Sequence, residues 1–75
     1  MGENYMTKYF YLGFNRDQTD VVDGIFINIT KYRMAERPEN NGIIIYRFKL
    51  EDRADIIKEL NYVGLRYIDY GVQPC

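Results

Sequence analysis

The side chains of this sequence that can do acid and base chemistry are mostly carboxylates, and their spacing limits what they can do. The closest group is Glu51, Asp52 and Asp55, which opens a segment with helical spacing. Negative charge at the start of a helix is stabilised by the helix dipole, and Asp52 is placed to cap the first turn. Because capping explains this group, we expect no acid and base pair of the glycosidase kind.

A second acidic group lies between residues 15 and 23 and has the composition of a cation-binding loop. An EF-hand loop that began at Asn15 would need glycine at its sixth position and glutamate at its twelfth. The sequence has Asp20 and Phe26 at these positions. We therefore expect no calcium site. A zinc site built from Cys and His is also excluded, because the sequence has no histidine and a single cysteine, Cys75.

Catalytic nucleophiles and cofactor loops are also missing from the sequence. It contains neither histidine nor serine, so catalysis by a Ser–His or Cys–His pair is excluded. Gly13, Gly24 and Gly42 stand apart from one another and do not make up a phosphate loop or a dinucleotide-binding motif. We therefore predict a non-enzymatic protein that binds no cofactor.

Length and composition limit the fold and the cell compartment. The sequence has 75 residues, of which 47% are apolar and 28% are charged, and this is typical of one folded domain with a thin core. A single cysteine allows no disulfide within the chain, and neither a signal peptide nor a run of about 18–20 apolar residues is present. We expect one domain over residues 1–75, flexible at 1–6 and frayed at 73–75, in the cytoplasm and away from membranes.

Alternating apolar residues predict two strands in the first half of the sequence. The first strand covers residues 8–14 and is followed by a polar loop at 15–20. The second strand is predicted at about 24–34, with a hairpin between the two. The residues expected to face the core are Phe10, Leu12 and Phe14 in the first strand and Ile25, Ile27 and Ile29 in the second.

The second half of the sequence predicts a third strand, a helix and a fourth strand. The third strand covers 43–50 and places Ile44, Tyr46 and Phe48 on the core side. The helix covers 51–63 and ends before Gly64, which suits a left-handed C-cap. A fourth strand follows at 65–72. The predicted fold is a single small α+β domain of order β-β-β-α-β, with a mostly antiparallel sheet and one helix packed on one face.

One helix of this length is about 17 Å long and covers one face of a four-stranded sheet. The opposite face must therefore meet something else. We predict that it binds a partner through Tyr9, Tyr11, Phe26, Tyr32, Ile43, Ile45, Arg47, Lys49 and Tyr67. The alternatives are that a loop or the N-terminal segment folds over this face, or that the strand registers differ by one residue, which would exchange the two sides.

Charge is divided between the expected elements. The strands carry basic residues, whereas the acidic residues belong to the helix and the first loop. An acidic surface of this kind could dock on a basic partner, although a solvated helix face is the simpler explanation. The net charge of −1 makes duplex DNA an improbable partner, because such domains rely on many cations to neutralise phosphates.

These observations favour a small interaction protein. In its compactness and lack of catalytic residues the chain resembles small accessory proteins of bacteria and their phages. We predict an inhibitor, adaptor or regulator that binds a second copy of itself as a homodimer, or a larger protein, through the sheet face or an unpaired strand edge. The alternative is a module for a small ligand or single-stranded nucleic acid, with the tyrosines as stacking platforms. The expected order lacks the first crossover helix of RNA-recognition sheets, which weakens this alternative.

Overall fold

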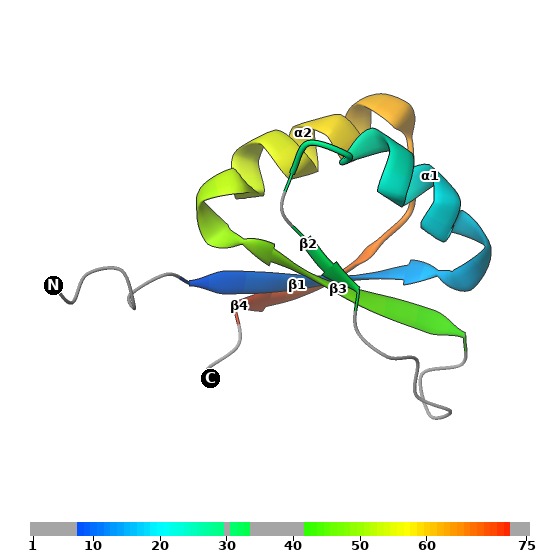
Figure 1. Ribbon diagram of the computed structural model, residues 1–75, viewed down its shortest axis with the longest axis horizontal. Helices are drawn as coiled ribbons and strands as arrows, with labels where there is room; N and C mark the ends of the chain where they lie inside the picture. The colour runs from blue at the N-terminus through cyan, green and yellow to red at the C-terminus, as the bar shows by residue number, and fades with distance from the viewer. Residues whose placement is uncertain (1–7, 30, 34–41, 73–75) are drawn as a thin grey trace, which may run out of the picture.

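The computed structural model describes residues 8–29, 31–33 and 42–72 (Figure 1). Within these residues one antiparallel sheet lies beneath two α-helices, and a short 3-10 turn precedes each helix. The elements in chain order are β1 (Tyr9–Asn15), η2 (Arg16–Gln18), α1 (Thr19–Ile25), β2 (Lys31–Arg33), β3 (Ile43–Lys49), η4 (Leu50–Asp52), α2 (Arg53–Val63) and β4 (Ile68–Val72). The chain is therefore an α+β domain, as predicted, but with a second helix.

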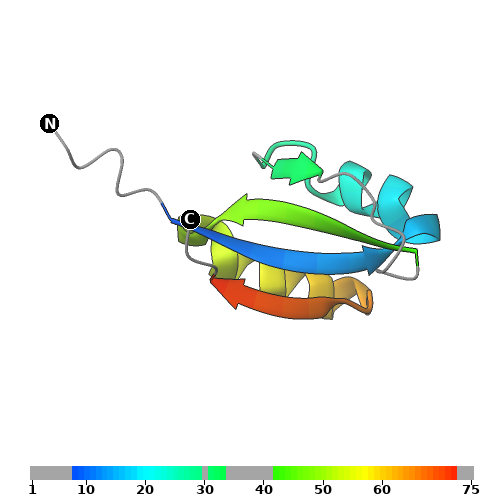
Figure 2. The same ribbon diagram turned by 90° about the horizontal axis from the view of Figure 1, so that it is seen from below.

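The four described strands are ordered β2-β3-β1-β4, and all neighbours are antiparallel. Each helix connects two parallel strands that have a third strand between them, so the units β1-α1-β2 and β3-α2-β4 interleave. This is the split β-α-β connectivity of ferredoxin-like sheets. Both helices lie on the same face of the sheet (Figure 1), and Figure 2 shows the strands in front of them from the other side. One face of the sheet is therefore covered by helices and the other is not.

The segment between β1 and β3 differs most from its prediction. A strand was expected at 24–34, but α1 forms at Thr19–Ile25 and the strand β2 has only three residues. Thr19, Val22 and Phe26 are buried at helical spacing, whereas Ile27 is 75% exposed. The alternation of isoleucines in this segment is therefore not that of a strand, and the predicted β-β-β-α-β order and single helix are wrong.

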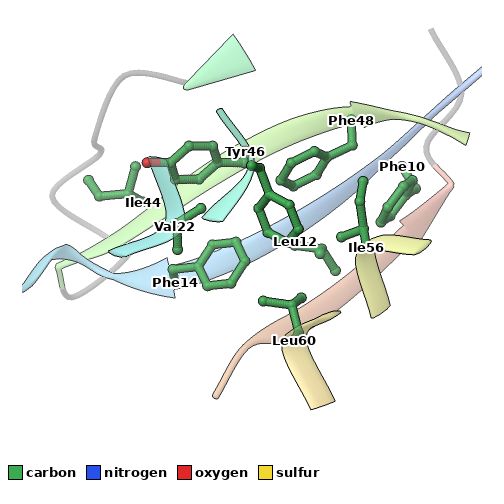
Figure 3. Close-up of a cluster of buried hydrophobic side chains, with 10 residues drawn as sticks. Phe10, Leu12, Phe14, Val22, Ile44, Tyr46, Phe48, Ile56 and Leu60 are labelled. Atoms are coloured by element: carbon green, nitrogen blue, oxygen red, sulfur yellow. The ribbon is translucent and has the colours of Figure 1, made fainter. Parts of the chain in front are cut away.

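The core forms between the two helices and the covered face of the sheet. The side chains on this face of β1 and β3 are those predicted, and Figure 3 shows them directed toward residues from both helices. Phe10 and Phe26 both pack against Phe48, with ring centroids 5.6 Å apart in each pair. The fully formed cluster consists of Phe10, Leu12, Phe14, Val22, Phe26, Ile44, Tyr46, Phe48, Ile56 and Leu60.

The second half of the fold follows its prediction more closely. The helix α2 begins at Arg53, after η4, and ends at Val63, where Gly64 has the predicted left-handed conformation with a φ of 75°. The Gly64 N–H donates to the carbonyl oxygen of Leu60 at 2.9 Å and closes the last turn. In the part of the chain that the structure describes, no helix is long and apolar enough to cross a membrane.

The strand β4 contains an irregularity that matters for the uncovered face. Tyr11 pairs with Gly71 and Leu12 pairs with Asp69, so Tyr70 is an extra residue opposite the two. Such a bulge bends an edge strand and disturbs its outer row of backbone groups. The bulge therefore makes this edge less regular for pairing with another strand.

Candidate functional site

The face of the sheet opposite the two helices, which we call the open face, is defined by strand register. Successive side chains of a strand point to opposite faces, and the even-numbered side chains of β1 and β3 are buried beneath the helices. Their odd-numbered neighbours therefore lie on the open face, and the backbone register pairs them across the two strands. These pairs are Tyr9 with Lys49, Tyr11 with Arg47, Gly13 with Ile45 and Asn15 with Ile43.

One half of the open face is aromatic and basic. Tyr9, Tyr11, Arg47 and Lys49 lie there, all of them partly buried. The guanidinium carbon of Arg47 lies 4.3 Å from the centroid of the Tyr9 ring, which is a cation–π contact worth about 0.5–1 kcal/mol at a site of this exposure. Within this half, the Arg47 guanidinium is therefore held against an aromatic ring.

The other half of the open face is aliphatic and packs closely around Gly13. A Cβ atom at Gly13 would lie 2.8 Å from Ile43 Cγ2 and 2.9 Å from Tyr70 Cε2, well inside the roughly 3.5–4.0 Å at which carbon atoms pack. Only glycine lets these two side chains lie over β1. Ile45 and Ile68 pair with Gly13 on its two sides, so an apolar cluster forms at this end of the face.

A hollow of about 240 Å³ opens at the aliphatic end. It is lined by Gly13, Asn15, Ile43, Arg66, Tyr67 and Ile68. Four of these belong to the open-face side of β1, β3 and β4. The volume is smaller than the roughly 300–1,000 Å³ of small-molecule sites, so the hollow is better suited to one side chain of a partner than to a complete ligand.

The carboxylates of the described chain lie away from the open face. Asp69, the one on β4, pairs with Leu12 of the covered face and forms an ion pair with Arg53 of α2. The hydrogen bond from Arg53 lowers the pKa of the Asp69 carboxyl, and the Gly71 N–H, which donates to Asp69 Oδ1 at 2.9 Å, lowers it further. The hydrogen bond that Arg53 donates to Asp69 also raises the pKa of the Arg53 guanidinium. The remaining described carboxylates are Asp17, Asp20, Asp23, Glu51, Asp52, Asp55 and Glu59, all in helices or 3-10 turns.

The structure brings most of the predicted site residues together, but not all. Phe26 was expected on the open face and is instead 1% exposed in the core, because α1 replaces the expected strand. Tyr67 packs against the core and also borders the hollow. Tyr32 pairs with Arg47 in the backbone register, and its side chain is outside the described set. The six residues that share the open face as predicted are Tyr9, Tyr11, Ile43, Ile45, Arg47 and Lys49.

Sequence reasoning missed three residues at this site, namely Arg66, Ile68 and Tyr70. The alternation of the last segment places Arg66, Ile68 and Tyr70 together and Tyr67 and Asp69 opposite them. That signal was present, but the prediction included only Tyr67 from this segment, and Tyr67 borders the hollow. The bulge at Tyr70 keeps this residue over Gly13 and completes the apolar end of the face.

Two further observations bear on the site. Among the described residues there is no group of three or more His, Cys, Asp or Glu side chains that could hold a metal ion. Comparison with protein-family models, with curated proteins and with solved structures found no match to this chain.

Proposed function

We propose that this protein is a non-enzymatic interaction module, a small inhibitor, adaptor or regulator that binds a protein partner through its open face. The observation that carries the proposal is the one-sided arrangement of the fold, with both helices on one face of the sheet and a Tyr, Ile and Arg surface on the other. We place it in the cytoplasm, because the sequence has no pair of cysteines to stabilise it in an oxidising compartment.

The composition of the open face supports a protein partner. Tyrosine and arginine are enriched at the energetically dominant positions of interfaces, and lysine and acidic residues are depleted in their cores. The aromatic half supplies the first two residue types, and the aliphatic half supplies an apolar centre with a hollow beside it. Scattered apolar residues are ordinary on a protein surface, but a contiguous group on one face is typical of an interaction site.

The proposal is tested by a face variant and a matched control. The face variant combines Tyr11→Ala with Arg47→Glu, and the control makes comparable changes on α2, Tyr62→Ala with Lys58→Glu, at two exposed positions. Affinity-tagged full-length proteins are compared by cross-linking in cells and by light scattering, with circular dichroism as the check on folding. We expect the wild type and the control to share a protein partner, or a dimer, that the folded face variant loses. If the face variant keeps every partner and the oligomeric state of the wild type, the proposal is wrong.

A second candidate function is favoured by one specific observation. The helix α1 supplies the first crossover helix that the predicted order lacked, so the sheet now has the strand order on which RNA-recognition domains stack bases. Under this reading Tyr9 and Tyr11 would stack bases and Arg47 would contact phosphate. Quenching of tyrosine fluorescence by a single-stranded oligonucleotide, reversed by salt and lost in the Tyr11→Ala, Arg47→Glu variant, would support it over a protein partner.

A further inference from the structure

The two layers of the molecule carry opposite charge. All eight described carboxylates lie in the helices, in the 3-10 turns or, for Asp69, on the helix side of β4. The open face carries Arg47 and Lys49, and Arg66 lines the hollow at its aliphatic end. The net charge of −1 hides this separation. A partner that meets the open face therefore meets positive charge on β3 and beside the hollow.

The cations of the face are well placed to receive carboxylates. Arg47 is held over the Tyr9 ring, and a guanidinium that is already ordered loses less side-chain entropy when it binds. Its planar group of N–H donors matches the geometry of a carboxylate. Lys49 lies one pair further along β3, opposite Tyr9. Two cations on one strand, two residues apart, would suit alternate side chains of an extended partner segment.

The hollow supplies a place for an apolar anchor of the same segment. Its lining includes the apolar residues Gly13, Ile43 and Ile68 and the polar residues Arg66 and Asn15. An aliphatic or aromatic side chain would contact the apolar part of the lining, and a neighbouring carboxylate would lie near Arg66. Interfaces of this kind depend on one or two buried anchors surrounded by contacts that exclude water.

We propose that the partner of the open face is an acidic protein segment with an aliphatic or aromatic anchor that fills the hollow. This inference rests on the proposed function and names the chemistry of the partner. The acidic helix layer of this protein faces the other way and does not steer such a partner. Opposite charges on the two surfaces raise the rate of encounter and select against basic competitors.

A second copy and a nucleic acid fit the face less well. In a symmetric face-to-face dimer the same patch meets itself, so Arg47, Lys49 and Arg66 of both copies would be brought together. Single-stranded nucleic acid needs a basic groove that follows the backbone, whereas half of this face is formed by Ile43, Ile45 and Ile68. An acidic protein segment with an apolar anchor suits both the cations and the aliphatic half of the face.

The test is a selection from a random peptide library displayed on phage, with the full-length wild type as the target. The Tyr11→Ala, Arg47→Glu variant is used to remove peptides that do not depend on the open face, and the Tyr62→Ala, Lys58→Glu variant is the matched control. We expect the retained peptides to share net negative charge and one recurrent aliphatic or aromatic position. A synthetic copy of the most enriched peptide should bind Arg66→Glu about fivefold more weakly than wild type, and Lys58→Glu equally well.

The outcomes separate this inference from the proposed function. Face-dependent peptides that are neutral or basic would refute the acidic partner and leave the protein-binding function standing. No face-dependent peptide, together with binding of a single-stranded oligonucleotide, would overturn both in favour of the second candidate function. Concentration-dependent growth of assemblies by light scattering, lost in the face variant, would show that the acidic helix layer of another copy occupies the face, which also overturns the inference.

Discussion

The two faces of one sheet in this protein are built from the same strands and have different physical roles. On the covered face, Ile44 and Phe48 are buried beneath α1 and α2. On the open face, their neighbours Ile45 and Arg47 are partly buried, and both helices lie on the other side of the sheet (Figure 1). Successive side chains of a strand point to opposite faces of the sheet, so each face receives about half of them. Because both helices lie on one face, the side chains of the other face have no helix packed on them. The side chains of the open face therefore contribute less to the free energy of unfolding than those of the covered face.

The largest difference between the two faces is expected when adjacent isoleucines of β3, one on each face, are truncated. Ile44→Ala removes a buried side chain and should lower the free energy of unfolding by about 2–5 kcal/mol. Ile45→Ala reduces the strand propensity by a similar amount but leaves a smaller cavity, so we expect the free energy of unfolding to fall by about 1 kcal/mol. Urea unfolding followed by circular dichroism measures both. Equal losses would mean that the open face is as well packed as the core, and the distinction between the faces would fail.

A smaller effect on the free energy of unfolding is expected when the hydroxyl group is removed from one tyrosine on each face of the sheet. The Tyr46 hydroxyl donates to Asp23 Oδ1 at 2.9 Å and connects β3 with α1. Tyr46→Phe leaves this carboxylate without that donor, and hydrogen bonds to charged groups contribute about 1.5–3 kcal/mol. Because Asp23 is partly exposed, we expect a loss of about 1–2 kcal/mol.

The matched change on the open face is Tyr11→Phe, which should alter stability by less than about 0.5 kcal/mol. Both variants are compared by thermal and urea unfolding at neutral pH. If Tyr46→Phe leaves the free energy of unfolding unchanged, the hydrogen bond between β3 and α1 does not contribute to stability.

The sequence allowed the covered face to be predicted better than the helix layer above it. The side chains of β1 and β3 are sorted by a strict period of two, and the helix α2 has apolar residues at helical spacing and a glycine at its C-cap. The segment of α1 contains two competing patterns. Thr19, Val22 and Phe26 have helical spacing, but Ile25 begins an alternation that continues beyond the helix. Gly24 and the β-branched residues favour the strand interpretation, and tertiary packing decides against it.

The candidate site was predictable where it depends on alternation and not where it depends on topology. Tyr11, Ile43 and Arg47 share the open face because their strands alternate with a period of two and pair antiparallel. The expected hairpin between the first two strands was wrong, since β3 lies between β1 and β2. Phe26 was misplaced because a helix stands where a strand was expected. Tyr70 was missed because its position over Gly13 depends on a bulge, and single-residue insertions in a strand leave little signal in a sequence.

A small effect on stability is expected from the ion pair between Arg53 and Asp69, which keeps the Asp69 carboxylate of β4 on the covered face. Because Arg53 lowers the pKa of Asp69 in the folded state, the pair contributes stability above the unfolded pKa of about 3.9, and this contribution is lost as the pH falls through the folded pKa. Both groups are about one third exposed, so we expect less than about 1 kcal/mol.

The variant Asp69→Asn removes the charge and keeps an oxygen that can accept from the Gly71 N–H. Its stability should lie below that of the wild type at pH 7 and approach it below about pH 3, when both are measured by urea unfolding across this range. On the open face, Lys49→Gln should show no comparable convergence in acid, because none of the described carboxylates lies on that face. A difference between wild type and Asp69→Asn that is constant with pH would mean that packing, and not charge, holds Asp69 on the helix side.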